Sequence, residues 1–194
     1  MKIEAVVLAA GYSSRAGTFK LELDINGKTV IERCLEGLND FCSRIIVVGG
    51  YRIDKIRAIL KNYPKVEVVL NNSFNLGMFS SVKTGLRHLQ GERFFFTPGD
   101  YPLISRNVCQ KLLQADGDIV IPVFNGRKGH PLLLKTKITA ELLKEDDGYN
   151  LRDFIRRQGF VPVTVEDEGI LWDLDTREDY QKILARLQGG GFHE

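Results

Sequence analysis

Short apolar runs alternate with stretches of helical periodicity along the first hundred residues of the chain. Apolar runs that stop at glycine, proline or polar residues predict strands at Ile3–Ala9, Ile45–Val48, Val66–Leu70 and Arg93–Thr97. Between them, apolar residues three and four positions apart predict helices at Thr29–Leu38, Ile53–Lys61 and Ser80–Leu89. Strands that alternate with helices in this way indicate a parallel sheet covered on both faces.

The alternation is less regular after Asp100. Two predicted strands, Asp118–Val123 and Pro131–Leu134, flank the turn Asn125-Gly126-Arg127 and read as a hairpin. The same spacing rules predict the remaining elements: helices at Asn107–Leu113, Thr139–Lys144, Leu151–Gln158 and Arg177–Leu187, and strands at Val161–Val165 and Ile170–Asp173.

Together these elements predict one domain over residues 1–188, followed by a flexible tail at 189–194, because no linker-like stretch divides the 194 residues. The expected architecture is a three-layer α/β/α sandwich around a mostly parallel, Rossmann-like sheet. Such sheets bind ligands outside the carboxyl ends of their strands. The loops at 11–20, 71–81 and 98–103 are therefore expected to form the functional site.

Composition narrows the possible functions. Lys and Arg number 27 and Asp and Glu 25, so a net charge of +2 gives no basic field for nucleic acid or an anionic membrane. No apolar run approaches the roughly 20 residues of a membrane span, and the first residues lack a signal-peptide pattern, so we expect a cytoplasmic protein. Cys34, Cys42 and Cys109 lack the spacing of a metal site and are expected in the core.

The loop after the first predicted strand suits phosphate binding. It combines flexible glycines, hydroxyl donors and two cations: Gly11, Gly17, Ser13, Ser14, Arg15 and Lys20. An ordinary strand-to-helix turn is the alternative. Neither of the two commonest phosphate motifs, Gly-x-x-x-x-Gly-Lys-Ser/Thr and Gly-x-Gly-x-x-Gly, is present, which favours another kind of nucleotide-binding fold.

This segment, VVLAAGYSSRAGTFK, resembles the Leu-x-Ala-Gly-Gly/x-x-Ser-x-Arg-Met-Gly-x-x-Lys signature of nucleotidyltransferases with a glycosyltransferase-A-like fold. These enzymes condense a nucleoside triphosphate with a phosphorylated acceptor. The Ala-Ala-Gly-x-Ser-Ser-Arg form is most similar to the molybdenum cofactor cytidylyltransferases, although Ala16 stands where the family usually has Met. The resemblance implies catalytic contacts to the triphosphate from Arg15 and Lys20. It also implies nucleotide contacts from the loop residues Leu8, Ala9, Ala10, Gly11, Ser13, Ser14 and Gly17.

Asp100 follows the strongly apolar strand Arg93–Thr97, in a stiff turn between Gly99 and Pro102. Gly-Asp-x-Pro is often a plain surface turn, but a carboxylate at the end of a central strand also suits a divalent cation that bridges nucleotide phosphates. The nucleotidyltransferases carry Gly-Asp-x-Pro here, with Mg²⁺ on the Asp. The resemblance therefore implies that Asp100 is a catalytic metal ligand and that Gly99 lies at the nucleotide.

A second acidic cluster precedes the last predicted helix. On a strand, Asp173 and Asp175 would point to one face, and Thr176 is placed to cap the helix with Asp179 in its first turn. Capping leaves Asp173 and Asp175 unexplained. The run resembles the family element Asp-Ile-Asp-Thr-Pro-Glu-Asp, with Arg177 in place of Pro, and implies Asp175 as the second metal ligand, ahead of Asp173.

Two further loops are candidates for substrate contacts. The stretch 71–81 offers Ser80 and Ser81 as helix caps, and its similarity to a family Asn…Gly-Met-x-x-Ser segment implies nucleotide contacts from Asn75, Gly77, Met78 and Ser80. A plain polar loop is the alternative. The turn at 126–131 resembles Gly-x-x-Gly-His-Pro of the cytidylyltransferases and implies acceptor contacts from Arg127, Lys128, Gly129, His130 and Pro131. The alternative is that His130 has only a structural role, with its hydrogen bonds made within the turn.

The leading hypothesis is a Mg²⁺-dependent nucleotidyltransferase. It would transfer a nucleoside monophosphate from CTP to a phosphorylated acceptor, molybdopterin being favoured, and release pyrophosphate. Alternatives are transfer from GTP or to a sugar phosphate, and a non-catalytic chaperone that delivers nucleotide or cofactor to a molybdoenzyme apoprotein. The intact Arg15, Lys20, Asp100 and Asp175 favour catalysis over the chaperone.

Overall fold

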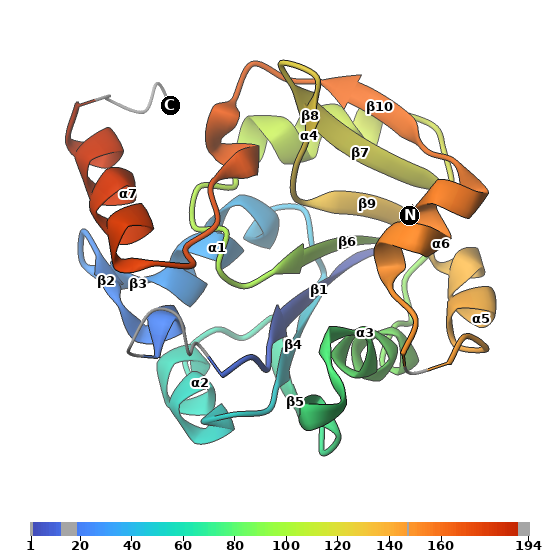
Figure 1. Cartoon of the computed structure of the whole chain (residues 1–194), viewed down its shortest axis with the longest axis horizontal. Helices are drawn as coiled ribbons and strands as arrows, with labels where there is room; N and C mark the ends of the chain where they lie inside the picture. Colours follow the sequence, from blue (N-terminus) through green and yellow to red (C-terminus); the bar gives the residue numbers. More distant parts are fainter. Residues whose placement is uncertain (1, 13–18, 147, 190–194) are drawn as a thin grey trace.

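A computed structural model of the chain describes residues 2–12, 19–146 and 148–189 (Figure 1). The strands are β1 (Ile3–Ala9), β2 (Asp24–Ile25), β3 (Lys28–Thr29), β4 (Arg44–Gly49), β5 (Val66–Leu70), β6 (Arg93–Pro98), β7 (Ile119–Phe124), β8 (Arg127–Lys128), β9 (Leu132–Lys135) and β10 (Val161–Thr164). The α-helices are α1 (Val30–Asn39), α2 (Ile53–Leu60), α3 (Met78–Arg87), α4 (Arg106–Gln114), α5 (Thr139–Leu142), α6 (Leu151–Gln158) and α7 (Arg177–Gly189).

Eight of these strands form one sheet in the order β10-β7-β9-β6-β1-β4-β5, with β8 paired to β7. Strand β1 pairs in parallel with both β4 and β6, and β5 extends the parallel block beyond β4. Strand β9 runs antiparallel to β6 and β7. The prediction of a mostly parallel α/β sheet is therefore confirmed.

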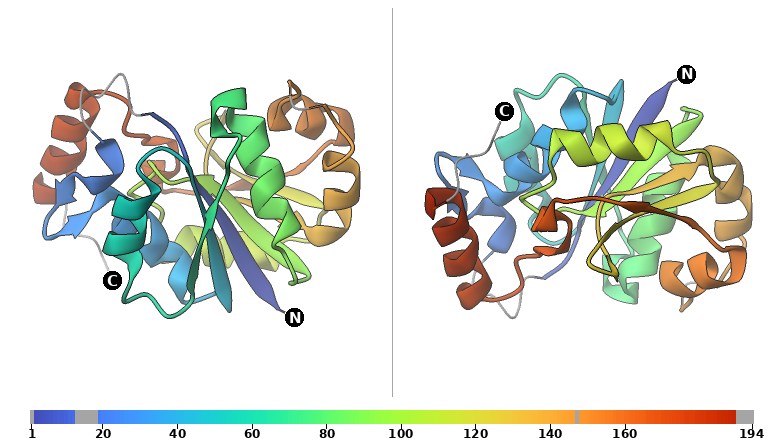
Figure 2. Two further views of the ribbon diagram at one scale, coloured as in Figure 1. Left: turned by 90° about the horizontal axis from the view of Figure 1, so that it is seen from below. Right: turned by 90° about the horizontal axis from the view of Figure 1, so that it is seen from above.

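Both faces of the sheet are covered by helices. Along β1, Ala5, Val7 and Ala9 belong to one buried cluster, whereas Val6 and Leu8 belong to the other, as the two-residue repeat of a strand requires. The first cluster takes in side chains from α1, α2, α4 and α7, and the second takes in α3, α5 and α6. Figure 2 shows α3 and α6 on one side of the strands and α1, α2 and α7 on the other. The predicted three-layer sandwich is present.

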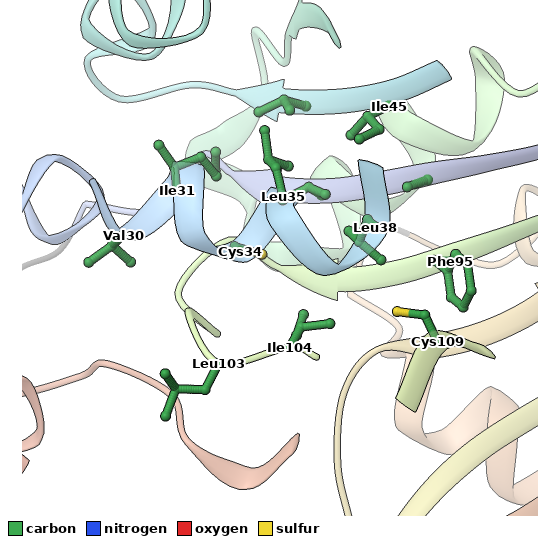
Figure 3. Close-up of a cluster of buried hydrophobic side chains, with 14 of the residues drawn as sticks. Val30, Ile31, Cys34, Leu35, Leu38, Ile45, Phe95, Leu103, Ile104 and Cys109 are labelled. Atoms are coloured by element: carbon green, nitrogen blue, oxygen red, sulfur yellow. The ribbon is translucent and has the colours of Figure 1, made fainter. Parts of the chain in front are cut away.

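Helix α1 illustrates how the sequence specifies this packing. Thr29 caps it: its hydroxyl oxygen accepts the backbone N–H of Glu32, whose carboxylate accepts the backbone N–H of Thr29 at 2.7 Å. The apolar residues of this helix, Val30, Ile31, Cys34, Leu35 and Leu38, recur at helical spacing and are all buried (Figure 3). The described structure also buries Cys42 and Cys109, which confirms the prediction that the cysteines lie in the core.

The hairpin predicted after Asp118 is present, and its tip adds the short strand β8. Asn125 and Gly126 both have positive φ, at 48° and 75°, and the register pairs Phe124 with Arg127. The closing helix α7 extends to Gly189, and residues 190–194 of the predicted tail lie outside the described structure. No helix among the described residues is long and apolar enough to span a bilayer.

The strand predicted at Ile170–Asp173 is wrong. Residues Glu168–Leu171 form a 3-10 turn, and the segment from Trp172 to Asp175 is irregular. The carboxylate of Asp167 starts this turn by accepting the backbone N–H of Gly169 at 2.8 Å. Gly169 itself packs so closely on the carbonyl of Leu103 that a Cβ there would lie 2.4 Å from the oxygen. Local capping and this close contact therefore override the apolar pattern.

Candidate active site

A cleft of about 620 Å³ opens at the carboxyl ends of β1 and β6. These two strands are neighbours, and Leu8 is paired with Pro98. Strands β4 and β5 lie on one side of β1, whereas β6 and the later strands β9 and β7 lie on its other side. Such a switch in connection direction leaves a crevice between the two loops. The cleft is lined by backbone and side chains from both loops and by later segments: Leu8, Ala9, Ala10, Gly11, Tyr12, Lys20, Leu21, Phe74, Asn75, Gly77, Met78, Ser81, Pro98, Asp100, Tyr101, His130, Arg152, Asp173 and Asp175.

The first half of the expected phosphate loop lines this cleft from Leu8 to Gly11. A Cβ added at Gly11 would meet no atom of the described residues within 4 Å. The predicted contacts at Ser13, Ser14, Arg15 and Gly17 lie outside the described residues.

Lys20 lines the cleft and joins its two acidic segments. Its Nζ donates to Oδ2 of Asp100 at 2.5 Å and to Oδ1 of Asp175 at 2.8 Å. All three side chains are largely buried, with exposed fractions of 15%, 17% and 27% for Lys20, Asp100 and Asp175. The motif residues that the sequence singled out separately therefore form one ion-paired cluster.

The two carboxylates keep Lys20 charged. Burial alone would lower the pKa of this ammonium, but the charges and hydrogen bonds of Asp100 and Asp175 outweigh burial and raise the pKa above its usual 10.5. Lys20 is therefore a fixed cation at neutral pH, as contact with a polyphosphate requires.

Asp100 is held rigidly by its own loop. The backbone N–H of Gly99 donates to the carbonyl of Leu8 at 2.8 Å, and a Cβ on Gly99 would lie 2.8 Å from Ile31. Gly99 therefore serves close packing beneath the cleft. Within the described structure, Oδ1 of Asp100 is buried and lacks a hydrogen-bond partner. A buried carboxylate oxygen without a partner is the kind of atom that a cation would satisfy.

The segment that carries Asp173 and Asp175 is tied directly to Asp100. Between the two acids, Leu174 is fully buried, and its backbone N–H donates to the carbonyl of Asp100 at 2.9 Å. Both carboxylates consequently border the cleft, as the sequence predicted, although on an irregular segment and not on a strand. Burial, followed by repulsion from Asp100 and Asp175, raises the pKa of Asp173 above its usual 3.8.

The loop before α3 supplies another wall of the cleft. Asn75, Gly77 and Met78 line it, whereas Ser80 is only 6% exposed and donates to the carbonyls of Ser73 and Gly77. The prediction that Ser80 and Ser81 cap the helix is wrong, because α3 begins at Met78 with Gly77 as its cap residue. Gly77 has a φ of 101°, a value that favours glycine.

The predicted acceptor turn divides into two parts. His130 lines the cleft, 4.6 Å from the ring centre of Tyr101, and its Nδ1 lies 3.4 Å from the carbonyl of Phe96. Burial lowers the pKa of His130 to about 4, so the ring is neutral at pH 7. A carbonyl only accepts, so Nδ1 carries the proton and Nε2 is left as an acceptor. A contact between His130 and the acceptor would therefore use a neutral ring, which accepts from an N–H or O–H.

The neighbouring residues of this turn do not line the cleft. Arg127 and Lys128 are exposed on β8, and Nζ of Lys128 lies 4.1 Å from the ring centre of Phe160. Gly129 packs against Ile170, where a Cβ would lie 2.3 Å from the carbonyl oxygen. Pro131 is buried and follows His130 through a cis peptide bond.

Two kinds of cleft residue were not predicted from the sequence. Tyr12 is 53% exposed and packs against Phe74 and Tyr51, with ring centres 5.4 and 5.3 Å away, and Phe74 lies directly on the backbone of Gly50. Tyr12 belongs to the motif segment but carries no charge or phosphate-binding group. Arg152 comes from α6, where no motif marks it.

Comparison with known proteins agrees with this geometry. The model of the MobA-like NTP transferase domain matches residues 5–163. A molybdenum cofactor cytidylyltransferase of Escherichia coli (strain K12) is 31% identical over 180 residues, covering 92% of this chain and 93% of that protein. A probable molybdenum cofactor guanylyltransferase of Aquifex aeolicus (strain VF5) is 29% identical, with 92% and 89% covered.

A solved nucleotidyl transferase from Methanothermobacter superposes with a TM-score of 0.83 at 27% identity, covering 95% of this chain and 97% of that one. The matched family region contains most of β1, the loop that follows it, Lys20, Asp100 and His130, which build much of the cleft. The chain therefore belongs to the MobA-like NTP transferase family and is a nucleotidyltransferase.

Proposed function

We propose that this nucleotidyltransferase uses Mg²⁺ and CTP to transfer a cytidylyl group to the phosphate of molybdopterin, with release of pyrophosphate. The observation that carries the proposal is the ion-paired cluster in the cleft, where Lys20 binds both Asp100 and Asp175. The names of the relatives support molybdopterin as the acceptor, since those proteins are molybdenum cofactor cytidylyl- and guanylyltransferases.

The carboxylates of the cleft fit a magnesium ion. Among the described residues, Oδ1 of Asp100 is buried and has no hydrogen-bond partner, and Asp175 binds the same lysine. No group of three or more His, Cys, Asp or Glu side chains that could hold a metal occurs within the described residues. Mg²⁺ commonly uses one or two carboxylates together with water and substrate phosphates, so this donor set suits a cation that binds with the nucleotide. Mg²⁺ bound there would neutralise charge on the α-phosphate and on the leaving pyrophosphate.

The reaction requires positioning and charge neutralisation more than a protein nucleophile. An oxygen of the acceptor phosphate attacks the α-phosphorus, a new P–O–P bond forms, and the bond to the leaving pyrophosphate breaks. Lys20 is a permanent cation in a largely water-excluded position and stabilises the charge that develops on the phosphates. The backbone from Leu8 to Gly11 and the loop at Asn75 to Met78 hold the nucleotide.

Transfer from GTP is the second candidate, because relatives at 27–29% identity are named guanylyltransferases. CTP is favoured because the Escherichia coli cytidylyltransferase is 31% identical over nearly the whole chain. The Gly-His-Pro sequence at 129–131, which resembles the cytidylyltransferases, supports the same preference.

Pyrophosphate release tests the proposal. The purified protein is incubated with Mg²⁺ and each of CTP, GTP, ATP and UTP, with and without molybdopterin. We expect release that requires both Mg²⁺ and molybdopterin and is fastest with CTP. Faster release with GTP would instead establish the guanylyltransferase. If no nucleotide gives pyrophosphate release and the protein binds molybdopterin tightly, the proposed reaction would be wrong and a delivery chaperone would be favoured.

Two aspartate variants show whether the cleft carries this activity. Asp100→Asn should abolish release while the fold is retained in circular dichroism. Asp116→Asn is the matched control, because Asp116 is 92% exposed and pairs with Lys135 away from the cleft. Equal loss in both variants would contradict the assignment.

A further inference from the structure

Arg152 brings a second cation to the cleft. It is the second residue of α6, its side chain is exposed, and it lines the same cleft as Lys20 and His130. Within the part of the chain that the structure describes, its guanidinium has neither an ion pair nor a hydrogen bond.

The helix that carries Arg152 is firmly anchored. The side chain of Asn150 caps it by accepting the backbone N–H of Asp153 at 2.8 Å. One turn further on, Phe154 and Ile155 are buried in the cluster that also holds Phe94 and Leu132. The backbone of Arg152 is therefore held by the capped and buried helix, and only the long side chain has to adapt to a ligand.

The charged residues of the cleft indicate a role for this guanidinium in binding an anion. Its described lining contains three carboxylates, at Asp100, Asp173 and Asp175, but only two cations. One of them, Lys20, is already bound to two carboxylates, and the nearby His130 ring is neutral at pH 7. A reaction between two phosphorylated substrates needs further positive charge, and Arg152 supplies it.

The position of Arg152 assigns it to the acceptor. The proposed nucleotide contacts come from β1 and from the loop that follows β5, whereas α6 lies in sequence between β9 and β10. Helix α6 packs in the same buried cluster as Leu132 of β9, the strand that begins two residues after His130. We propose that Arg152 binds the phosphate group of the acceptor, using the paired N–H donors of its guanidinium. This assignment rests on the proposed transfer to a phosphorylated acceptor.

The test compares Arg152→Gln with Arg156→Gln in kinetics and in equilibrium binding of molybdopterin. Arg156 is the matched control, because it lies one turn along the same helix, is 75% exposed and pairs with Asp153 outside the cleft. In Arg152→Gln we expect the KM and Kd for molybdopterin to rise roughly 10- to 100-fold, the effect of losing hydrogen bonds to a charged group. The KM for the nucleotide should stay unchanged. Arg152→Lys should recover only part of the affinity, because it keeps the charge but loses the planar pair of donors.

Each remaining outcome is decisive. Unchanged affinity for molybdopterin in Arg152→Gln would overturn the assignment, as would a raised KM for the nucleotide alone, which would place Arg152 on the triphosphate. If the wild-type protein releases no pyrophosphate but binds molybdopterin through Arg152, the proposed reaction fails and the assignment stands. If the wild-type protein does not bind molybdopterin at all, both are overturned.

Discussion

Lys20 and Asp100 are 80 residues apart in the sequence, yet the ammonium of one lies 2.5 Å from a carboxylate oxygen of the other. The contact joins the glycine loop after β1 to the turn after β6. Since Lys20 also binds Asp175, its removal would take away the ammonium that links these two largely buried carboxylates.

Lys20→Ala should lower kcat/KM by roughly 30- to 1000-fold, because one preorganised charged donor contributes about 2–4 kcal/mol to transition-state stabilisation. Steady-state pyrophosphate release measures this. Lys28→Ala is the control, since Lys28 is an exposed lysine that pairs with Glu36 outside the cleft. An unchanged kcat/KM in Lys20→Ala would remove Lys20 from the proposed mechanism.

His130 should make stability depend on pH below neutrality. Burial lowers its pKa in the folded protein to about 4, whereas the unfolded chain has the usual value near 6.5. Between these two values the unfolded state binds more protons, so the free energy of unfolding falls as the pH falls from about 6.5 to 4. The full loss is on the order of 3 kcal/mol, from 1.36 kcal/mol for each pH unit. Urea unfolding across this range should show a shallower slope for His130→Gln than for the wild type, and equal slopes would contradict the prediction.

The cap of α7 should contribute to stability and to the position of Asp175. The hydroxyl oxygen of Thr176 accepts the backbone N–H of Asp179, and the Asp179 carboxylate accepts the backbone N–H groups of Thr176 and Asp175. This reciprocal pair confirms the capping predicted from the sequence. Thr176→Ala should reduce the free energy of unfolding by about 1 kcal/mol.

A double-mutant cycle checks the same cap. Thr176→Ala and Asp179→Ala should be non-additive, because each variant removes the shared hydrogen bonds. Asp179→Ala should also lower activity more than Thr176→Ala, since only Asp179 holds the backbone of Asp175. Strict additivity in chemical denaturation would show that the two residues act independently.

Gly85→Ala should destabilise the protein although alanine is the better helix former by about 1 kcal/mol. A Cβ at Gly85 would lie 2.4 Å from Val6 and 3.0 Å from Val48, two fully buried residues of the central strands. Overpacking of this kind costs about 1–3 kcal/mol, more than the gain in helix propensity. Thermal or urea unfolding measures the difference, and Gly148→Ala, where a Cβ would meet no atom of the described structure within 4 Å, is the control. A gain in stability for Gly85→Ala would show that helix α3 can shift away from the sheet.

Elements whose signal is local could be predicted from the sequence. β1, β5 and α6 have the predicted bounds, because each is a continuous apolar run or a complete amphipathic repeat with clear ends. The hairpin of β2 and β3 was not predicted, since two-residue strands cannot show alternation. Its Asn26-Gly27 turn, with both φ values positive, was the available signal.

In the candidate site too, features marked by local motifs could be predicted, whereas contacts between distant segments could not. Asp100 and Asp175 were predicted as partners from motifs, but the sequence could not show that Lys20 joins them, because that contact depends on the packing of three distant segments. Arg152 looks like any exposed residue on an amphipathic helix. Ser80, by contrast, sits in a motif yet donates to backbone carbonyls of its own loop, a role that residue type alone does not reveal.

The separation of 155 residues between Lys20 and Asp175 has a consequence for how the enzyme is made. During synthesis, the sheet from β5 to β6 can pair and cover its core well before residue 175 has left the ribosome, because its contacts are nearer in sequence. The hydrogen bond between Lys20 and Asp175 can form only after nearly the entire chain has been synthesised. A truncated product would therefore keep much of its sheet while lacking the ion pair between Lys20 and Asp175, so the presence of this pair reports that the full-length chain has folded.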